Sequence, residues 1–190
     1  MKYKLALFAS GSGSNVENIY NFFKDNNMIC PSLLICNNKN AYVIERAKKL
    51  NLLYKIVESN SKKNSELLSF LKKKKITHLI LAGYLKLIEK EIIMVYKNKI
   101  LNIHPALLPN FGGKGYYGDF VHKSVLDANE SKSGITIHLV NEKYDDGKVL
   151  FQKEVSIDKS ETINSLASKI HKLEYKYYPE IIEKYILNQL

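Results

Sequence analysis

The sequence predicts an α/β protein, a Rossmann-like three-layer sandwich with a mostly parallel sheet and antiparallel C-terminal strands. Two observations predict it. In the N-terminal half, short apolar runs alternate with amphipathic segments at the spacing of strand–helix–strand units. Such units build a parallel sheet that is covered by helices on both faces. Toward the C-terminus, two apolar runs follow one another with only a turn between them, which indicates an antiparallel pair.

The N-terminal half contains five apolar runs that are typical of buried strands. They are Tyr3–Ala9, Ser32–Cys36, Leu53–Val57, His78–Ala82 and Ile100–His104. The stretches between them have apolar residues at helical spacing. They predict a first helix that has Val16, Ile19, Tyr20 and Phe23 on one stripe and ends near Lys24. Three further helices are predicted over Ala41–Leu50, Ser65–Lys74 and Glu89–Tyr96.

The C-terminal half begins with a glycine-rich stretch, Asn110–Gly118, whose irregular sequence predicts a loop. After it we predict a helix, two strands joined by a turn, and a closing helix with an extension. Their ranges are Phe120–Asn129, Gly134–Val140 and Val149–Val155 with the turn Tyr144–Gly147, then Thr162–Tyr175 and Pro179–Leu187.

The composition is that of a single globular domain. The 190 residues are 45% hydrophobic, which is enough for one core, and no linker or repeat interrupts them. No run approaches the ~18 apolar residues of a membrane span, so no membrane is expected as a partner. Cys30 and Cys36 are the only cysteines, so neither a disulfide framework nor a zinc site is expected. This cysteine usage predicts a cytoplasmic location.

A formal charge of +10 raises the possibility of a nucleic-acid partner. However, Arg46 is the only arginine, and lysine supplies the rest of the positive charge. Arginine's planar fork is favoured for phosphate and base recognition. We therefore expect no nucleic-acid partner and attribute the charge to compositional bias, although it can attract a small anionic substrate. A non-catalytic RNA-binding module is the alternative that the charge suggests.

The stretch Ile100–Pro109 has two polar residues, Asn102 and His104, in a run that is otherwise apolar. In a strand, residues two positions apart project from the same face. Pro105 holds His104 in the extended region and marks the end of the strand. A histidine beside a carboxamide indicates a proton-transfer site, although buried Asn and His side chains often only satisfy backbone groups. Catalysis is favoured because open α/β sheets bind ligands beyond the carboxyl ends of their strands.

The stretch Gly11–Asn15 lies between a strand and a helix, where free N–H groups and the helix dipole favour an anion. Val16 stands where the dinucleotide fingerprint needs its third glycine, and no Gly-Lys-Ser/Thr follows as in a P-loop. These features predict a monophosphate site and argue against a dehydrogenase. The alternative is an ordinary tight turn with Ser14 or Asn15 as the N-cap.

Asp145, Asp146 and Gly147 form a stretch typical of a turn between two strands. A carboxylate brought close to His104 from this turn would raise the pKa of the histidine and keep it charged. His78, His122 and His171 lack metal-ligand spacing with one another, and no metal is expected.

Four motifs together resemble the formyltransferases that use 10-formyltetrahydrofolate. They are ASGSGSN at Ala9–Asn15, LAGYLKLI at Leu81–Ile88, LNIHPALLP at Leu101–Pro109 and SGITIHLVNEKYDDGKVLFQ at Ser133–Gln152. Their order and spacing match the family, and the resemblance covers essentially the whole chain. The GSGSN stretch points to the branch that handles a ribonucleotide.

The resemblance implies a catalytic trio of Asn102, His104 and Asp145. It implies ribonucleotide contacts from Gly13, Ser14, Asn15, His171, Lys172, Leu173 and Glu174. It implies folate contacts from Leu85, Lys86, Leu87, Ile88, Asn102, Asn141, Glu142, Lys143, Tyr144 and Asp145. It also divides the domain into a ribonucleotide half, about 1–100, and a folate and catalytic half, about 101–190.

The sequence departs from the family pattern at three places. Asp146 stands where many members have glycine, which makes it a rival to Asp145. The family's folate-contacting arginine has no counterpart in Asn60–Lys63, so that contact is unassigned. The loop Phe111–Gly118 differs from the commoner Tyr-Pro-Gly form.

The resemblance implies formyl transfer from 10-formyltetrahydrofolate to the primary amine of glycinamide ribonucleotide, in purine biosynthesis. Both are small-molecule partners, and the protein is expected to be a monomer or homodimer. The alternatives within the superfamily are a methionyl-tRNA formyltransferase and a formyltetrahydrofolate hydrolase. Each has an additional domain, for which we expect no room beside the predicted elements.

Overall fold

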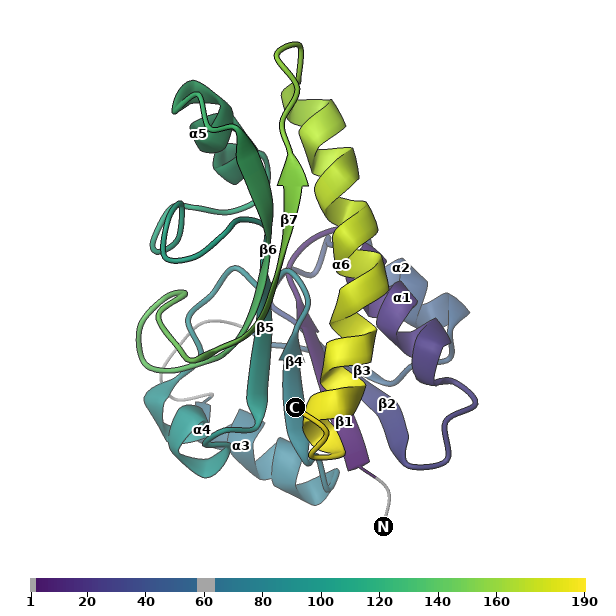
Figure 1. Cartoon of the computed structure of the whole chain (residues 1–190). Helices are drawn as coiled ribbons and strands as arrows, with labels where there is room; N and C mark the ends of the chain where they lie inside the picture. The colour runs from purple at the N-terminus through teal and green to yellow at the C-terminus, as the bar shows by residue number, and fades with distance from the viewer. Residues whose placement is uncertain (1–2, 58–63) are drawn as a thin grey trace. The chain divides into compact units, whose positions relative to one another are not determined.

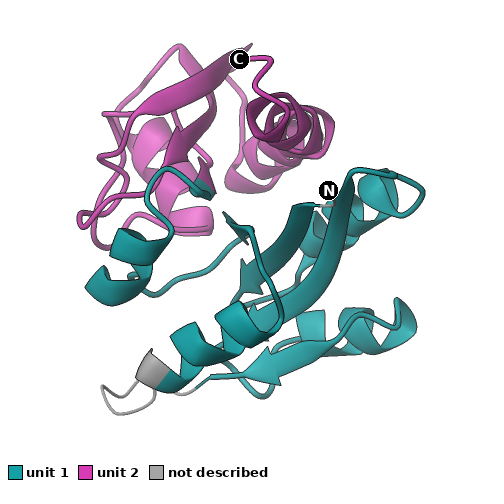
Figure 2. Ribbon diagram, turned by 90° about the horizontal axis from the view of Figure 1, so that it is seen from below, with its two compact units in different colours: residues 1–101 teal, residues 102–190 magenta. Residues whose placement is uncertain are grey.

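A computed structural model describes residues 3–57 and 64–190 of the chain, with side chains from residue 66 onward in the second range. The chain divides into two compact units, residues 1–101 and 102–190, which are coloured teal and magenta in Figure 2. The boundary falls inside strand β5, Ile100–His104.

The first unit contains a sheet of parallel strands (Figure 1). The strands are β1 (Tyr3–Ala9), β2 (Ile29–Cys36), β3 (Tyr54–Ile56) and β4 (His78–Leu81). Their order is β3-β2-β1-β4. Leu5–Ala9 and Leu79–Leu81 are buried, as expected of central strands that helices cover on both faces.

Four helices connect these strands and lead to β5. They are α1 (Ser14–Phe23), α2 (Val43–Lys49), α3 (Asn64–Lys73) and α4 (Lys90–Val95). Helix α1 packs against β1, β2 and α2. Crossovers between parallel strands are right-handed, and the connection from β3 to β4 runs back across the sheet. This rule puts α3 on the face opposite α1 and α2, which makes three layers.

The second unit contains the antiparallel pair and two helices. Its elements after β5 are α5 (Asp119–Asp127), β6 (Lys132–Leu139), β7 (Val149–Ser156) and α6 (Ile163–Ile186). Strands β6 and β7 are antiparallel, with Lys132 opposite Ser156. Strand β6 is buried along nearly its whole length, whereas β7 is largely exposed. Helix α6 packs against β6, β7 and α5.

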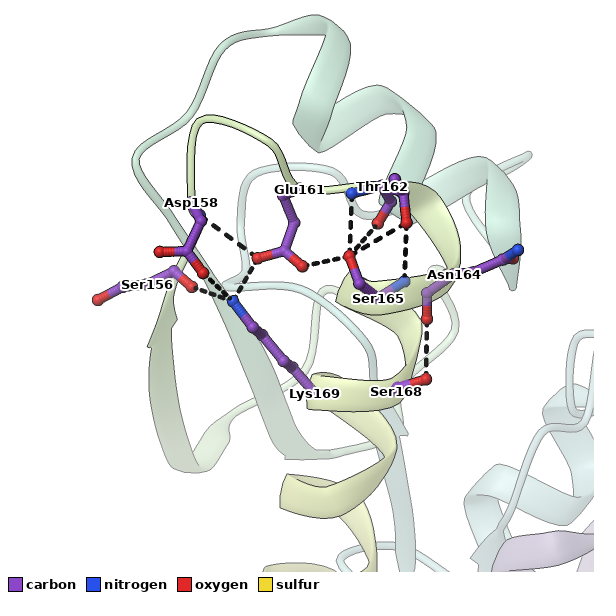
Figure 3. A network of polar contacts seen from close by, with 8 residues as sticks. All are labelled: Ser156, Asp158, Glu161, Thr162, Asn164, Ser165, Ser168 and Lys169. Atoms are coloured by element: carbon purple, nitrogen blue, oxygen red, sulfur yellow. Dashed lines mark hydrogen bonds and ion pairs between the residues drawn. The ribbon is translucent and has the colours of Figure 1, made fainter.

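Helix α6 begins at a capping box (Figure 3). Thr162 Oγ1 accepts from the Ser165 backbone N–H at 3.1 Å, and Ser165 Oγ accepts from the Thr162 N–H at 2.9 Å. Lys169, one turn further on, pairs with Asp158 and Glu161 of the preceding turn. These contacts fix the point at which the chain leaves β7 and enters the helix.

The fold class predicted from the sequence is confirmed, and every predicted element in the described residues is present. Two details differ. Strand β2 begins earlier than predicted, at Ile29. It includes Pro31, which pairs with Leu5 at a shift in the strand register. A proline, which has no N–H to donate to the neighbouring strand, is tolerated at such an irregularity. Helix α6 is one helix of 24 residues with Pro179 in its interior, rather than a helix and a separate extension. Pro179 lies on the buried face, where packing offsets its missing N–H.

Among the described residues, none of the helices combines the length and apolar character needed to cross a membrane. The division of function between residues 1–100 and 101–190 within a single domain stays a prediction.

Candidate active site

Strand β5 presents Asn102 and His104 from the same face, as the alternation predicts. Ile100, Leu101 and Ile103 are buried and anchor the strand. His104 is itself only 4% exposed. The chemistry of this position is therefore set by the few polar atoms that reach the imidazole.

Each ring nitrogen of His104 faces an acceptor. Nε2 donates to the Phe111 carbonyl at 2.7 Å, and Nδ1 lies 3.5 Å from Oδ2 of Asp145. The same carboxylate oxygen accepts from the Gly113 backbone N–H at 3.0 Å. Asp145 thus links the loop after β5 to the turn between β6 and β7.

Asn102 joins the cluster through its amide. Its Nδ2 lies 3.1 Å from Nε2 of His138 and 3.4 Å from Oδ1 of Asp145. His138 donates from Nδ1 to the Leu139 carbonyl at 2.8 Å, which leaves Nε2 as an acceptor for the Asn102 amide. Both amide hydrogens of Asn102 therefore have partners, and the longer bond to Asp145 is the one that a ligand can replace at less cost.

The structure corrects the predicted direction of the pKa shift of His104. Burial lowers the pKa of His104 below its ordinary value of 6.5, and the Asp145 carboxylate and the Phe111 carbonyl oppose this without overcoming it. Burial thus disfavours the standing cation that the sequence argument expects. The sequence argument considered the carboxylate alone, and burial could not be weighed without the fold.

Asp145 is ionised in this setting. Burial raises its pKa, but His138, His104 and the Gly113 N–H together outweigh burial and hold the pKa below its ordinary value of 3.8. Asp146 is exposed and accepts from the Asn141 side-chain amide at 3.1 Å. Of the two rival aspartates, only Asp145 faces His104.

The turn places Asp145 by backbone geometry. Asp145 has φ 53°, in the left-handed region that aspartate tolerates in turns. A Cβ on Gly147 would lie 1.7 Å from the Leu139 carbonyl oxygen, so the turn needs glycine there. Asp145 and Gly147 together allow the hairpin to fold back tightly beside the end of β6.

His138 is a member of the cluster that sequence reasoning missed. It is 1% exposed, and its Nε2 lies 3.6 Å from Oδ1 of Asp145. A register shift follows Ile137, so that His138 pairs with Val149 and Leu150 is passed over. Such bulges re-aim side chains next to active sites. The signal was available, because Thr136 and His138 alternate in an apolar run as Asn102 and His104 do.

The predicted anion-binding loop lies in the first unit, between β1 and α1. Gly13 is the N-cap of α1, with φ 76°, and no side chain caps the helix. The alternative in which Ser14 or Asn15 acts as a conventional N-cap is therefore wrong. A Cβ on Gly13 would lie 2.2 Å from Cγ2 of Val43, so glycine is required both for its conformation and for this close approach.

A hydrogen-bonded serine links this loop to the segment after β4. Ser10 Oγ donates to Oδ1 of Asn37 at 2.6 Å and accepts from the Leu85 backbone N–H at 2.9 Å. Of the predicted folate residues in this segment, Leu85, Lys86 and Leu87 are exposed and Ile88 is buried. The carboxyl ends of β1 and β4 thus present adjacent segments at one edge of the sheet.

The remaining predicted site residues are spread over the second unit. On α6, Glu174 is buried at 6% exposure, while His171 and Lys172 are exposed and His171 stacks on Tyr175 at 5.9 Å. In the turn after β6, the side chains of Glu142, Lys143 and Tyr144 are exposed and Asn141 is half-buried. The segment Asn60–Lys63, which has no counterpart of the family's folate-contacting arginine, lies outside the described residues. Within residues 3–57 and 64–190, no group of three or more His, Cys, Asp or Glu side chains is arranged to hold a metal ion.

The sequence model of the family described as formyl transferase matches residues 3–182. The chain belongs to the formyl transferase family. A relative named phosphoribosylglycinamide formyltransferase, from Bacillus subtilis, is 37% identical over 187 residues, which cover 95% of this chain and 93% of the relative. The chloroplastic protein of the same name from Arabidopsis thaliana is 40% identical over 94% of this chain.

The chain spans 64% of the Arabidopsis thaliana protein and 60% of the corresponding protein from Vigna unguiculata. Among solved structures, glycinamide ribonucleotide transformylase 1 from Geobacillus kaustophilus aligns with a TM-score of 0.88 and 37% identity, over 96% of this chain and 97% of that chain. In this member of the formyl transferase family, the side chains of Asn102, His104, His138 and Asp145 form one cluster.

Proposed function

We propose that this protein transfers a formyl group from 10-formyltetrahydrofolate to the primary amine of glycinamide ribonucleotide, as a step of purine biosynthesis. One observation carries the proposal. The buried His104 imidazole lies 3.5 Å from the Asp145 carboxylate in a member of the formyl transferase family. Formyl transfer to an amine needs a group that takes one proton from the nucleophile and returns it to the leaving nitrogen.

The names of the relatives support glycinamide ribonucleotide as the acceptor. The loop Gly13–Asn15 supports it independently, because the first turn of α1 has backbone N–H groups that suit a phosphate. We propose that Gly13, Ser14 and Asn15 bind the ribonucleotide phosphate. Glu174, with His171–Leu173 before it, is proposed to contact the same substrate.

The donor, 10-formyltetrahydrofolate, is proposed to bind at Leu85–Ile88 and Asn141–Asp145. Leu85 is 49% exposed and Leu87 is 41% exposed, so they offer an apolar surface that suits the rings of a folate. The turn at Asn141–Asp145 offers backbone groups to the polar edge of a pterin. The same turn carries Asp145, which belongs to the catalytic cluster.

In the proposed mechanism, the amine attacks the formyl carbon to form a tetrahedral intermediate. With its Nε2–H held by the Phe111 carbonyl, neutral His104 accepts the proton from the amine at Nδ1, and the imidazolium is then stabilised by Asp145 beside that nitrogen. The proton passes to the leaving nitrogen as the old carbon–nitrogen bond breaks, which yields formylglycinamide ribonucleotide and tetrahydrofolate. Proton transfer of this kind contributes ~10²–10⁴-fold in rate.

Asn102 is proposed to donate a hydrogen bond to the oxyanion of the intermediate. To do so, its amide exchanges the 3.4 Å bond to Asp145 for the developing negative charge. His138 keeps the other amide hydrogen and so holds the amide plane in place. Losing one oxyanion donor typically costs ~10²–10³-fold in rate.

We propose that the protein acts in the cytoplasm as a monomer or homodimer, on small-molecule substrates alone and without a metal. The cysteine usage supports the location, and the single arginine argues against a nucleic-acid partner.

The decisive experiment measures tetrahydrofolate release by absorbance, with glycinamide ribonucleotide as acceptor. We expect release that depends on this acceptor and is unaffected by EDTA. Release with water alone would indicate a hydrolase, and release only with charged initiator tRNA would indicate a tRNA formyltransferase. Either result would overturn the proposed acceptor. RNA binding that weakens steeply with salt, without any release, would overturn the enzyme assignment altogether.

A further inference from the structure

Arg46, on helix α2 of the first unit, makes three contacts, one of which is with the anion-binding loop. Its Nε donates to the Ser12 carbonyl at 3.0 Å. Its Nη1 forms an ion pair with Oε2 of Glu17, in the first turn of α1. Its guanidinium lies over the ring of Tyr42, with 5.1 Å from Cζ to the ring centroid.

The backbone of α2 contacts the same loop. The Val43 N–H donates to the Gly11 carbonyl at 3.1 Å, and the side chain of Val43 fills the space beside Gly13. With Arg46 on Ser12, three consecutive residues of the loop are touched by α2. The Gly11 and Ser12 carbonyls thus both accept hydrogen bonds from α2.

Arg46 is also the only arginine among 29 basic residues. A composition that uses lysine at every other cationic position makes the exception informative. An ammonium is a compact point charge, whereas a guanidinium bonds in two directions from one plane and stacks on an aromatic ring. The three contacts of Arg46 use all of these properties at once, whereas a lysine ammonium has neither the planar fork nor the stacking face.

We propose that Arg46 is a positioning residue for the ribonucleotide: it clamps Gly11–Asn15 in the conformation that binds the substrate phosphate. Arg46 acts through the Ser12 carbonyl and Glu17, and it does not itself touch the phosphate. Glu17 is the partner that neutralises the guanidinium, so the geometry of Arg46 rather than its charge is what the site uses. This inference rests on the proposed function, since it concerns binding of the ribonucleotide.

The test measures binding of glycinamide ribonucleotide and, separately, of tetrahydrofolate by calorimetry to the full chain. Arg46→Lys keeps the charge and removes the fork. We expect it to weaken ribonucleotide binding about 10-fold, in line with the loss of one hydrogen bond from a charged group. Tetrahydrofolate binding and kcat at saturating ribonucleotide should stay within about 2-fold of the wild type, as expected if only the position of the loop changes. Glu17→Gln should weaken ribonucleotide binding in the same direction by a smaller factor.

Lys48 provides the matched control for charge. It lies on the same helix and pairs at the surface with Glu45 at 2.7 Å. Arg46→Met and Lys48→Met remove the same charge from α2, and only Arg46→Met should weaken ribonucleotide binding. Equal weakening by both, or an Arg46→Lys protein that binds like the wild type, would show that charge and not geometry matters, and would overturn the inference.

Loss of tetrahydrofolate affinity in parallel with ribonucleotide affinity would also overturn it, because a general loss of structure then explains the effect. If Arg46→Met does not fold, Arg46→Lys and Glu17→Gln still decide the question. Failure of the proposed function looks different, since the wild type itself would then not bind glycinamide ribonucleotide.

Discussion

Oδ2 of Asp145 lies 3.5 Å from Nδ1 of His104, and Oδ1 of the same carboxylate lies 3.4 Å from Nδ2 of Asn102. One side chain therefore contacts both polar residues of β5. It reaches them from a turn more than forty positions further along the chain. The carboxylate is placed to orient the imidazole and to hold the amide until a substrate replaces one of its bonds.

The first prediction separates the two neighbouring aspartates. Asp145→Asn should lower kcat by ~10²–10³-fold, because it removes the charge that stabilises the His104 cation during proton transfer. His104→Ala should lower it by at least as much. Asp146→Asn should stay within about 3-fold of the wild type, since Asp146 is exposed and bonded to Asn141. Steady-state rates at saturating substrates test this, and a crippled Asp146→Asn protein beside a mild Asp145→Asn protein would refute the assignment.

The second prediction concerns the pH dependence of kcat/KM. The mechanism needs neutral His104, so the rate falls as pH falls through the histidine's pKa, which burial lowers below 6.5. The acidic limb should therefore lie below pH 6.5. Asp145 acts to raise this pKa, so Asp145→Asn should move the limb to still lower pH while reducing the plateau. A limb above pH 6.5 in the wild type would contradict the neutral imidazole, and Asp146→Asn provides the control.

The third prediction concerns stability in acid. His78 on β4 is 8% exposed, and burial, helped by Lys99, lowers its pKa to about 4. The unfolded chain binds this proton from about pH 6.5 downward and the folded chain only near pH 4, so stability is lost on acidification between these values. From pH 7.5 to pH 5, the single group should cost about 2 kcal/mol.

Urea unfolding at the two pH values measures this loss. His78→Leu should lose about 2 kcal/mol less than the wild type over the same interval, because leucine does not titrate. His104 and His122, whose pKa values burial also lowers, stay in both proteins and account for the residual slope. An unchanged slope in the variant would rule out His78 as a source of acid sensitivity.

The fourth prediction concerns the capping box of α6 in Figure 3. Thr162→Ala removes the acceptor for the Ser165 N–H and should lower the free energy of unfolding by about 1 kcal/mol. Thr162→Ser keeps the hydroxyl and should stay near the wild type. Urea midpoints at an unchanged m-value provide the measurement. Equal losses in both variants would mean that packing of the threonine methyl, and not the cap, is responsible.

Most elements could be predicted because their signals are local. The apolar run Tyr3–Ala9 and the alternation around Asn102 depend only on neighbouring residues. The single α6 was harder, because the proline inside it is tolerated only through its burial in the tertiary fold. His138 escaped notice for a different reason. Its role depends on Asn102 and Asp145, which lie in other segments of the chain.

The sequence by itself determined the order of the elements, the fold class, the presence of Asn102 and His104 on one strand face, and the motifs of the formyl transferase family. Periodicity, turn chemistry and motif spacing carry this information over short distances. Only the tertiary structure decided that Asp145 rather than Asp146 faces His104, and that burial lowers the pKa of His104. It also decided that Gly13 begins α1 without a side-chain cap. These outcomes depend on burial and on contacts between residues far apart in the chain, and neither quantity exists until the chain has folded.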